Sequence, residues 1–396
     1  MMDNLKAVIL DDDEFMLNAI QAMLESMGVH DIEADTSASR ALHELDMHNP
    51  RQVLLCDLNM PNMDGVEVIR HLGQGGFKGS VVVLSGEDGR TLQTAVNIGR
   101  TLNLQFLGAL SKPVDRQELQ GLLEQIQSKS LTALATHSLL SEAELRNGLI
   151  GDALTPYFQP QVDARSGRLV GMEALARWRH PTDGMLGPGV FISVAEESDL
   201  IAKMTEQMLT RSMRQWRAWH EAGVDLDLSV NISMRALSHV GFPDWLVNEA
   251  QAAGVPLKHL VLEITESQPS LNAAVSSDVL ARLCLKRIRL SIDDFGTAYS
   301  SMEKLQMLPF HELKIDKAFV HGASSNMLSH SILKSSVELG RNLGMRTVAE
   351  GVESQEDWDN AVKAGVDLIQ GYFVAAPMQS EQVIGWLQQW KSRSLS

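Results

Sequence analysis

The sequence predicts an α/β protein with two domains: a doubly wound five-stranded parallel sheet, followed by an eight-stranded β/α barrel. Three observations lead to this prediction. The chain has 396 residues, which is more than one typical domain. Short apolar segments alternate with amphipathic ones, as in consecutive βαβ units. The spacing between the apolar segments lengthens near residue 150, which indicates that the architecture changes there.

Composition and charge exclude several classes of protein. Apolar residues make up 44% of the chain, and no apolar run approaches the roughly 18 residues of a membrane-spanning helix, so we expect no membrane insertion. The formal net charge of −16 argues against DNA as a partner. The strand-like segment Lys6–Leu10 leaves no room for a signal peptide. Because Cys56 and Cys284 stand among apolar residues, like small buried hydrophobes in a reducing compartment, we expect a cytoplasmic protein.

The first domain, residues 1–127, contains five strand candidates that alternate with five helix candidates. In a doubly wound sheet, the working side chains lie at the carboxyl ends of the strands. We predict strands at Ala7–Leu10, Asp31–Ala34, Val53–Cys56, Val81–Leu84 and Phe106–Leu110. We predict helices at Glu14–Met27, Ala38–Met47, Val66–Leu72, Thr91–Leu102 and Arg116–Gln127.

Carboxylates, a hydroxyl and an ammonium group follow four of these strands. Asp11 and Asp12 follow the first strand and Asp57 follows the third. Ser85 follows the fourth strand and Lys112 the fifth. Three carboxylates beside a lysine are suited to a divalent cation and a phosphoryl group, which one aspartate could accept covalently.

With Asn59-Met-Pro-Asn-Met-Asp-Gly65 and Lys112-Pro113, these positions make the whole segment resemble the receiver domain of two-component response regulators. The resemblance implies a cognate sensor histidine kinase as a partner. It implies a Mg²⁺-dependent phosphorylation site with Asp57 as acceptor, Asp11, Asp12 and Asp57 as metal ligands, and Ser85 and Lys112 in support. A receiver-like domain that is never phosphorylated is the alternative. Ala109 stands where the family often has a switch aromatic.

Residues 128–149 are predicted to form a partly helical linker. Ser141 has the place of a helix N-cap, and Glu142 and Glu144 supply acids to the first turn. Such a connector can transmit a change of domain arrangement, or it can be a passive spacer.

The second domain, residues 150–396, contains eight strand candidates, most of them separated by amphipathic helices such as Asp199–Ala222 and Ser329–Leu343. This order fits a TIM-type (β/α)8 barrel, in which polar residues at the carboxyl ends of the strands form the active site. The strands are predicted at Tyr157–Val162, Leu169–Trp178, Leu226–Ile232, Leu260–Ile264, Ile288–Ile292, Glu312–Ile315, Arg346–Ala349 and Leu368–Phe373.

Polar side chains lie in or just after seven of these strands. They are Glu173, Asn231, Glu263, the adjacent pair Asp293 and Asp294, Lys314, Glu350 and Gln370. A charged group within an apolar strand is costly unless it is paired or bound to a metal, so their convergence predicts a site. Oxygen ligands favour Mg²⁺ or Mn²⁺ over Zn²⁺. Two such ions bridged by one carboxylate would suit in-line phosphodiester hydrolysis.

The second domain resembles the EAL-type cyclic di-GMP phosphodiesterases along its whole length. The motifs are Met172-Glu-Ala-Leu-Ala-Arg-Trp-Arg-His-Pro181, Ser229-Val-Asn-Ile-Ser233, Leu262-Glu-Ile-Thr-Glu266, Asp293-Asp-Phe-Gly296, Lys314-Ile-Asp316, Ala349-Glu-Gly-Val-Glu353 and Gln370-Gly-Tyr-Phe373. The resemblance implies a modified barrel with an antiparallel first strand. It implies hydrolysis of cyclic di-GMP to linear pGpG under the control of phosphorylated Asp57. It also implies a homodimer or larger assembly.

The resemblance further implies a role for each matching residue. The implied ligands of two Mg²⁺ or Mn²⁺ ions are Glu173, Asn231, Glu263, Asp293 and Asp294, and the implied catalytic residues are Lys314 and Glu350, the latter a candidate general base. The implied substrate-binding residues are Gln159, Leu175, Arg177, Asp316, Glu353, Gln370, Tyr372 and Pro377. The implied loop and regulatory residues are Glu266, Phe295, Gly296, Ala298, Ser300 and Ser301, with Ala298 standing where the family has glycine.

Two other functions stay open. The barrel could be catalytically silent and pass cyclic di-GMP binding to a protein partner, or it could be the scaffold of a phosphorelay or docking protein. Silent members typically lose metal ligands, whereas every ligand position is filled here, which favours the enzyme.

Overall fold

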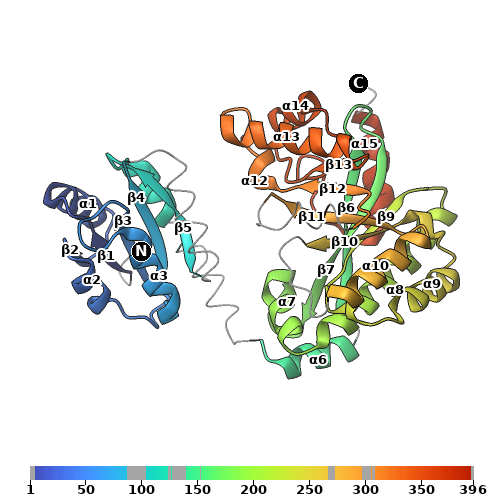
Figure 1. Cartoon of the computed structure of the whole chain (residues 1–396), viewed down its shortest axis with the longest axis horizontal. Helices are drawn as coiled ribbons and strands as arrows, with labels where there is room; N and C mark the ends of the chain where they lie inside the picture. Colours follow the sequence, from blue (N-terminus) through green and yellow to red (C-terminus); the bar gives the residue numbers. More distant parts are fainter. Residues whose placement is uncertain are drawn as a thin grey trace. The chain divides into compact units, whose positions relative to one another are not determined.

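The computed structural model describes residues 5–86, 104–123, 126, 140–151, 153–265, 273–296, 305 and 308–393. The chain forms two compact units, Met1–Ser138 and Leu139–Ser396 (Figure 1). Among the described residues, no helix combines the length and the apolar character needed to cross a membrane.

The first unit contains a five-stranded parallel sheet, as predicted, and its strand order is β2-β1-β3-β4-β5. Apolar side chains alternate between its two faces, so each face has its own core. Helix α1 packs on one face, and helices α2 and α3 pack on the other. The strands are β1 Lys6–Leu10, β2 Asp31–Asp35, β3 Gln52–Asp57, β4 Ser80–Ser85 and β5 Gln105–Ser111. The helices are α1 Glu14–Ser26, α2 Ala38–Glu44 and α3 Gly65–Gly75, and residues 116–123 are also helical.

One helix of this unit is shorter than predicted. Helix α2 ends at Glu44 rather than Met47 because the backbone of Leu45 is extended. The side chain of Asp46 then accepts a hydrogen bond from His48 N and forms a turn in place of another helical turn. The helix predicted at Thr91–Leu102 lies outside the described residues.

Eight strands of the second unit close into a barrel. Strand β6 pairs antiparallel with both of its neighbours, β7 and β14, whereas all other pairs within the barrel are parallel. The predicted barrel with an antiparallel first strand is therefore confirmed. The strands are β6 Leu154–Asp163, β7 Leu169–His180, β9 Asp227–Asn231, β10 Leu260–Thr265, β11 Arg289–Phe295, β12 Glu312–Ile315, β13 Arg346–Ala349 and β14 Leu368–Ile369. A short strand, β8 Gly184–Leu186, forms a hairpin with the end of β7.

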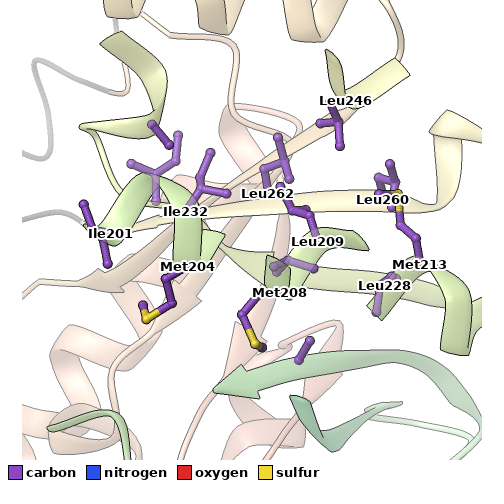
Figure 2. Packing of buried hydrophobic residues seen from close by; sticks show 14 of the residues in the cluster. Ile201, Met204, Met208, Leu209, Met213, Leu228, Ile232, Leu246, Leu260 and Leu262 are labelled. Carbon is purple, nitrogen blue, oxygen red and sulfur yellow. The ribbon is translucent and has the colours of Figure 1, made fainter. Parts of the chain in front are cut away.

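Helices surround the barrel (Figure 1). Helix α8 contributes Met204, Met208 and Met213 to a buried cluster that also contains Leu228 of β9 and Leu262 of β10 (Figure 2). The helices are α6 Glu142–Ile150, α7 Pro188–Glu197, α8 Leu200–Glu221, α9 Phe242–Ala253, α10 Ala273–Leu285, α12 Lys317–Val320, α13 Met327–Asn342, α14 Gln355–Ala364 and α15 Val383–Arg393. The described residues also include the short 3₁₀ turns η1 Ala236–Ser238, η2 Leu257–His259 and η3 Ser380–Gln382.

Side-chain caps fix where two of these helices begin. Ser141 Oγ accepts a hydrogen bond from Glu144 N, and the carboxylate of Glu144 accepts one from Ser141 N, so the predicted cap of α6 is confirmed. Ser354 and Asp357 form the same reciprocal pair at the start of α14. Each pair satisfies backbone donors that the first helical turn leaves free.

The last strand of the barrel is shorter than predicted. Strand β14 ends at Ile369, because the next residues pair with the segment after β13 instead of extending the barrel. Val352 N donates to Gln370 O at 3.1 Å, and Phe373 N donates to Val352 O at 2.9 Å. A Cβ on Gly371 would stand 2.2 Å from Val352 O, so this close approach requires glycine. Gln370 therefore lies just beyond the strand rather than inside it.

Candidate active site at the carboxyl end of the barrel

Lys314 on β12 lies at the centre of the predicted site. Its side chain is 1% exposed, and its Nζ lies 2.7 Å from Glu263 Oε2 and 2.7 Å from Glu350 Oε1. The same Nζ lies 3.0 Å from Asp293 Oδ1 and 3.5 Å from Glu173 Oε2. Carboxylates that are separated by up to 177 positions, from Glu173 to Glu350, thus converge on one ammonium group.

Two amide side chains fix the carboxylate of Glu173 on β7. Asn231, the last residue of β9, donates from Nδ2 to Glu173 Oε1 at 2.7 Å. Gln370 donates from Nε2 to Glu173 Oε2 at 2.5 Å. Both oxygens of Glu173 therefore have a donor, and the carboxylate is held in one orientation.

Asp293 and Asp294 lie on the same side of β11, although they are adjacent in sequence. Consecutive residues of a regular strand point to opposite faces of the sheet. Here the β11–β12 register shifts between Ile292 and Phe295, and Asp294 has a left-handed φ of 56°. This bulge brings ligand oxygens of Asp293, Asp294 and Glu350 within 4.8 Å of one another. A non-glycine residue in this conformation costs about 1–3 kcal/mol, which is a strain typical of functional sites.

The pKa shifts in the cluster indicate that the positive charge of Lys314 does not balance the negative charges of the surrounding carboxylates. Burial, followed by the charges of Asp293 and Asp316, raises the pKa of Asp294 to about 7. Burial and then the neighbouring carboxylates raise the pKa of Glu263 well above its usual value. Burial alone would lower the pKa of Lys314, but the surrounding carboxylates outweigh it and raise the pKa. A further cation would stabilise the ionised forms of these acids.

The donor set fits Mg²⁺ or Mn²⁺. Within the part of the chain that the structure describes, Glu263 Oε1 is buried and accepts no hydrogen bond. A buried carboxylate oxygen without a donor is costly, and a cation beside it would remove that cost. The other donors are carboxylate and amide oxygens, which suit hard cations.

A cavity of about 460 Å³ opens onto the cluster. Six of the predicted substrate-binding residues line it: Gln159, Leu175, Asp316, Glu353, Gln370 and Tyr372. A second cavity of about 310 Å³ shares Glu173, Leu175, Asp293 and Asp294 with the first and extends between β7, β9, α7 and α8. Asn231 lines this second space, so all predicted ligands except the fully buried Glu263 face a cavity.

Two predicted substrate-binding residues lie apart from these cavities. Neither Arg177 nor Pro377 is among the described residues that line the two cavities. The Arg177 guanidinium lies 5.8 Å from the centre of the Tyr157 ring, and its Nη1 donates to Ala176 O at 2.8 Å. Tyr372, by contrast, lines the larger cavity with 67% of its surface exposed.

The loop that follows β11 is described only in part. Phe295 is buried, and Gly296 has a left-handed φ of 101°, which glycine adopts readily. The other predicted loop and regulatory positions, Glu266, Ala298, Ser300 and Ser301, lie outside the described residues.

The site includes residues that the sequence reading did not single out. Lys317, Gly351 and Gly371 line the larger cavity, and Gln161 donates a hydrogen bond to Gln370. Gln161 was recognisable in principle, since it stands two residues after Gln159 and must share its face of β6. Gly351 has a left-handed φ of 63°, and a Cβ there would stand 2.3 Å from the Cβ of Lys317.

The first unit gathers its predicted residues at the carboxyl ends of its strands. Lys112 Nζ lies 2.7 Å from Asp11 Oδ2 and 2.8 Å from Asp57 Oδ2. Asp11, Asp12 and Asp57 each offer an oxygen within 4.8 Å of the others. Burial raises the pKa of Asp11 in spite of the adjacent ammonium group. Ser85 is buried at the end of β4, and its carbonyl accepts from Lys112 N at 3.0 Å.

The family model of the response regulator receiver domain matches residues 7–124. The EAL domain model matches residues 142–377, more than half of the chain. The chain belongs to the EAL domain family. Its EAL domain is the unit that holds the carboxylate cluster around Lys314.

Known proteins align with one or both of these domains. The chain is 30% identical to the cyclic di-GMP phosphodiesterase RocR of Pseudomonas aeruginosa, over 97% of this chain and 99% of RocR. It is 36% identical to the bifunctional diguanylate cyclase/cyclic di-GMP phosphodiesterase MucR of the same organism, over 64% of this chain and 37% of MucR. The solved PaMucR phosphodiesterase, a c-di-GMP complex, is 37% identical with a TM-score of 0.58, covering 61% of this chain and 98% of that one.

Proposed function

We propose that the chain is a response-regulator phosphodiesterase that hydrolyses cyclic di-GMP to linear pGpG, with a rate set by phosphorylation of Asp57. The observation that supports it best is the bulge that turns Asp293 and Asp294 toward Glu350 beside a roomy cavity. The full-length similarity to RocR, a cyclic di-GMP phosphodiesterase, supports the substrate. Residues 1–127 would be the receiver, 128–149 the linker and 150–396 the catalytic domain.

Five side chains would hold two Mg²⁺ or Mn²⁺ ions in the EAL domain. They are Glu173, Asn231, Glu263, Asp293 and Asp294, with Asp293 shared between the two ions. When bound, such ions lower the pKa of a water molecule and stabilise charge on the phosphate oxygens. Asp11, Asp12 and Asp57 would hold Mg²⁺ in the receiver.

Lys314 and Glu350 would act on the reacting groups. The carboxylates around Lys314 keep its ammonium group charged and fixed, so it can stabilise negative charge that develops at the cavity. Glu350 Oε1 pairs with Lys314 Nζ at 2.7 Å, and its carboxylate would accept a proton from the attacking water. Glu350 also lines the cavity, where that water must lie.

The remaining cavity residues would bind the dinucleotide. Tyr372 offers an exposed ring at the rim on which a guanine can stack. Lys317 places a positive charge beside the cavity for a phosphate. Gln159 would instead stabilise the wall of the cavity, because its Nε2 donates a hydrogen bond to Ala375 O at 3.1 Å. We propose that Arg177 contacts substrate only after leaving the Tyr157 ring.

The first prediction concerns turnover. The purified full chain with Mg²⁺ or Mn²⁺ is expected to convert cyclic di-GMP to pGpG, and a chelator is expected to stop the reaction. Chromatography of the nucleotides measures both. The Glu173→Gln variant, which keeps the shape but removes the charge, serves as the inactive control. Binding of the dinucleotide without any pGpG would favour a silent sensor that signals through a protein partner.

The second prediction concerns control by the receiver. Beryllofluoride, which mimics the phosphoryl group, is expected to change the phosphodiesterase rate of the full chain. The two sites lie in separate units, so the effect must pass through a rearrangement of domains or subunits. Asp57→Asn should remove the response and leave the basal rate. The rate is measured at two protein concentrations, since we also propose a homodimer or larger assembly. An unchanged rate would refute the coupling.

A further inference from the structure

Gln161 on β6 is a buried amide that no predicted role accounts for. Its side chain is 1% exposed, and its Nε2 donates to Gln370 Oε1 at 2.9 Å. Gln370 Nε2 in turn donates to Glu173 Oε2 at 2.5 Å and to Gln159 Oε1 at 3.1 Å. A chain of hydrogen bonds therefore runs from Gln161 through Gln370 to the carboxylate of Glu173.

The chemistry of the three side chains determines which group donates and which accepts in each of these hydrogen bonds. An ionised carboxylate only accepts hydrogen bonds, so Gln370 must turn its NH₂ group toward Glu173. Its carbonyl oxygen then faces the opposite way, within the buried interior, and needs a donor. The NH₂ group of Gln161 is that donor. Without it, the carbonyl oxygen of Gln370 would be buried without a donor, and Gln370 would be held less firmly against the carboxylate of Glu173.

The neighbouring strand leaves room for the Gln161 side chain. Gln161 pairs with Gly171 of β7, two residues before Glu173, which itself pairs with Gln159. A Cβ on Gly171 would stand 3.0 Å from Gln161 Oε1, so any larger residue would press on the amide. The pairing of β6 with β7 thus places both the amide and the space for it beside the same carboxylate.

We propose that Gln161 is a positioning residue that acts through Gln370 to hold Glu173 in the orientation for binding a divalent cation. The inference rests on the proposed function, in which Glu173 is a metal ligand. Residues that orient a ligand from behind typically contribute 10–100-fold to metal affinity or activity. Because Gln161 acts one hydrogen bond further away, the lower end of this range applies.

Mn²⁺ binding to the full chain, measured by calorimetry without substrate, tests the proposal. Gln161→Met keeps the length of the side chain and removes the donor, and it is expected to weaken Mn²⁺ binding about tenfold. It should lower kcat while KM stays close to that of the wild type, since no contact with the dinucleotide is lost. In the background of Gln370→Met, the same substitution should have little further effect, because both residues act through one chain of hydrogen bonds.

Two controls separate positioning from folding. Gln207 on α8 donates to Leu149 O at 2.8 Å, so Gln207→Met removes a comparable amide bond and should leave Mn²⁺ affinity unchanged. If Gln161→Met does not fold, Gln161→Ser is measured in its place with the same expectation. A lower melting temperature with unchanged Mn²⁺ affinity would overturn the proposal, and so would additive effects of the two substitutions.

A further variant distinguishes failure of this inference from failure of the proposed function. Glu173→Gln should lose Mn²⁺ binding at the barrel site. If it binds as well as the wild type, the ligand assignment itself is wrong. If it binds poorly while Gln161→Met binds normally, only the positioning role of Gln161 is refuted.

Discussion

Asp293→Asn is expected to lower the turnover of cyclic di-GMP by roughly a thousandfold or more, because it removes the carboxylate proposed to be shared by both metal ions. Asparagine has nearly the same shape, so the loss would come from charge alone. Asp293 Oδ1 lies 3.0 Å from Lys314 Nζ, and an Asp293 oxygen lies within 4.8 Å of Asp294 and Glu350. The measurement is kcat from the appearance of pGpG, together with Mn²⁺ affinity.

Asp244 offers the matched control for this variant. It is an exposed aspartate on α9, outside the site, and it pairs with Arg282 on α10 and with Lys286 just after that helix. Asp244→Asn should therefore keep the wild-type rate. Wild-type turnover in Asp293→Asn would mean that the cluster around Lys314 does not hold the metal ions.

Lys314→Met is expected to lower the free energy of unfolding of the barrel by about 3–5 kcal/mol without metal, because it leaves buried carboxylates without their counter-charge. Glu263 and Glu350 each lie 2.7 Å from the ammonium group that would be lost. Saturating Mg²⁺ should restore part of the stability, since it supplies positive charge to the same acids. Turnover should be lost under both conditions.

Tryptophan fluorescence during urea unfolding reports this effect in the barrel alone. All seven tryptophans lie in the second domain, so the receiver does not contribute to the signal. Lys317→Met is the control, because Lys317 is exposed beside the same cavity and, within the described part of the chain, takes no part in the buried ion pairs of Lys314. Equal stability of Lys314→Met and the wild type, with a chelator present, would contradict the role of Lys314.

The alternation of apolar and amphipathic segments was sufficient to predict the two α/β domains, whereas the antiparallel first strand of the barrel followed from the resemblance to the EAL-type phosphodiesterases. The positions of Glu173, Glu263 and Lys314 were also predictable, because a charge within an apolar strand must find a partner. What the pattern could not provide was backbone detail that depends on distant segments. The bulge at Asp294 depends on pairing with β12, and the early end of β14 depends on the approach of Val352 to Gly371.

The orientation of individual side chains could not be predicted from the sequence either. A motif places Arg177 beside Glu173 in sequence, but the Tyr157 ring determines where its guanidinium lies. Gln161 has the alternation of a strand residue, yet its importance depends on Gln370, which stands 209 positions later. Contacts of this kind require knowledge of which strand closes the barrel.

The reversed direction of β6 decides where the connector from the receiver meets the barrel. An all-parallel barrel would receive its first strand at the end remote from the catalytic groups. Here Leu154, the first residue of β6, pairs with Trp178 near the carboxyl end of β7, and Gln159 already pairs with Glu173. Helix α6 directly precedes this strand, and a Cβ on its Gly148 would stand 2.7 Å from Trp178 Nε1. Helix α6 therefore joins the barrel at the same end as the carboxylates, only a few residues of chain before Gln159, the partner of Glu173.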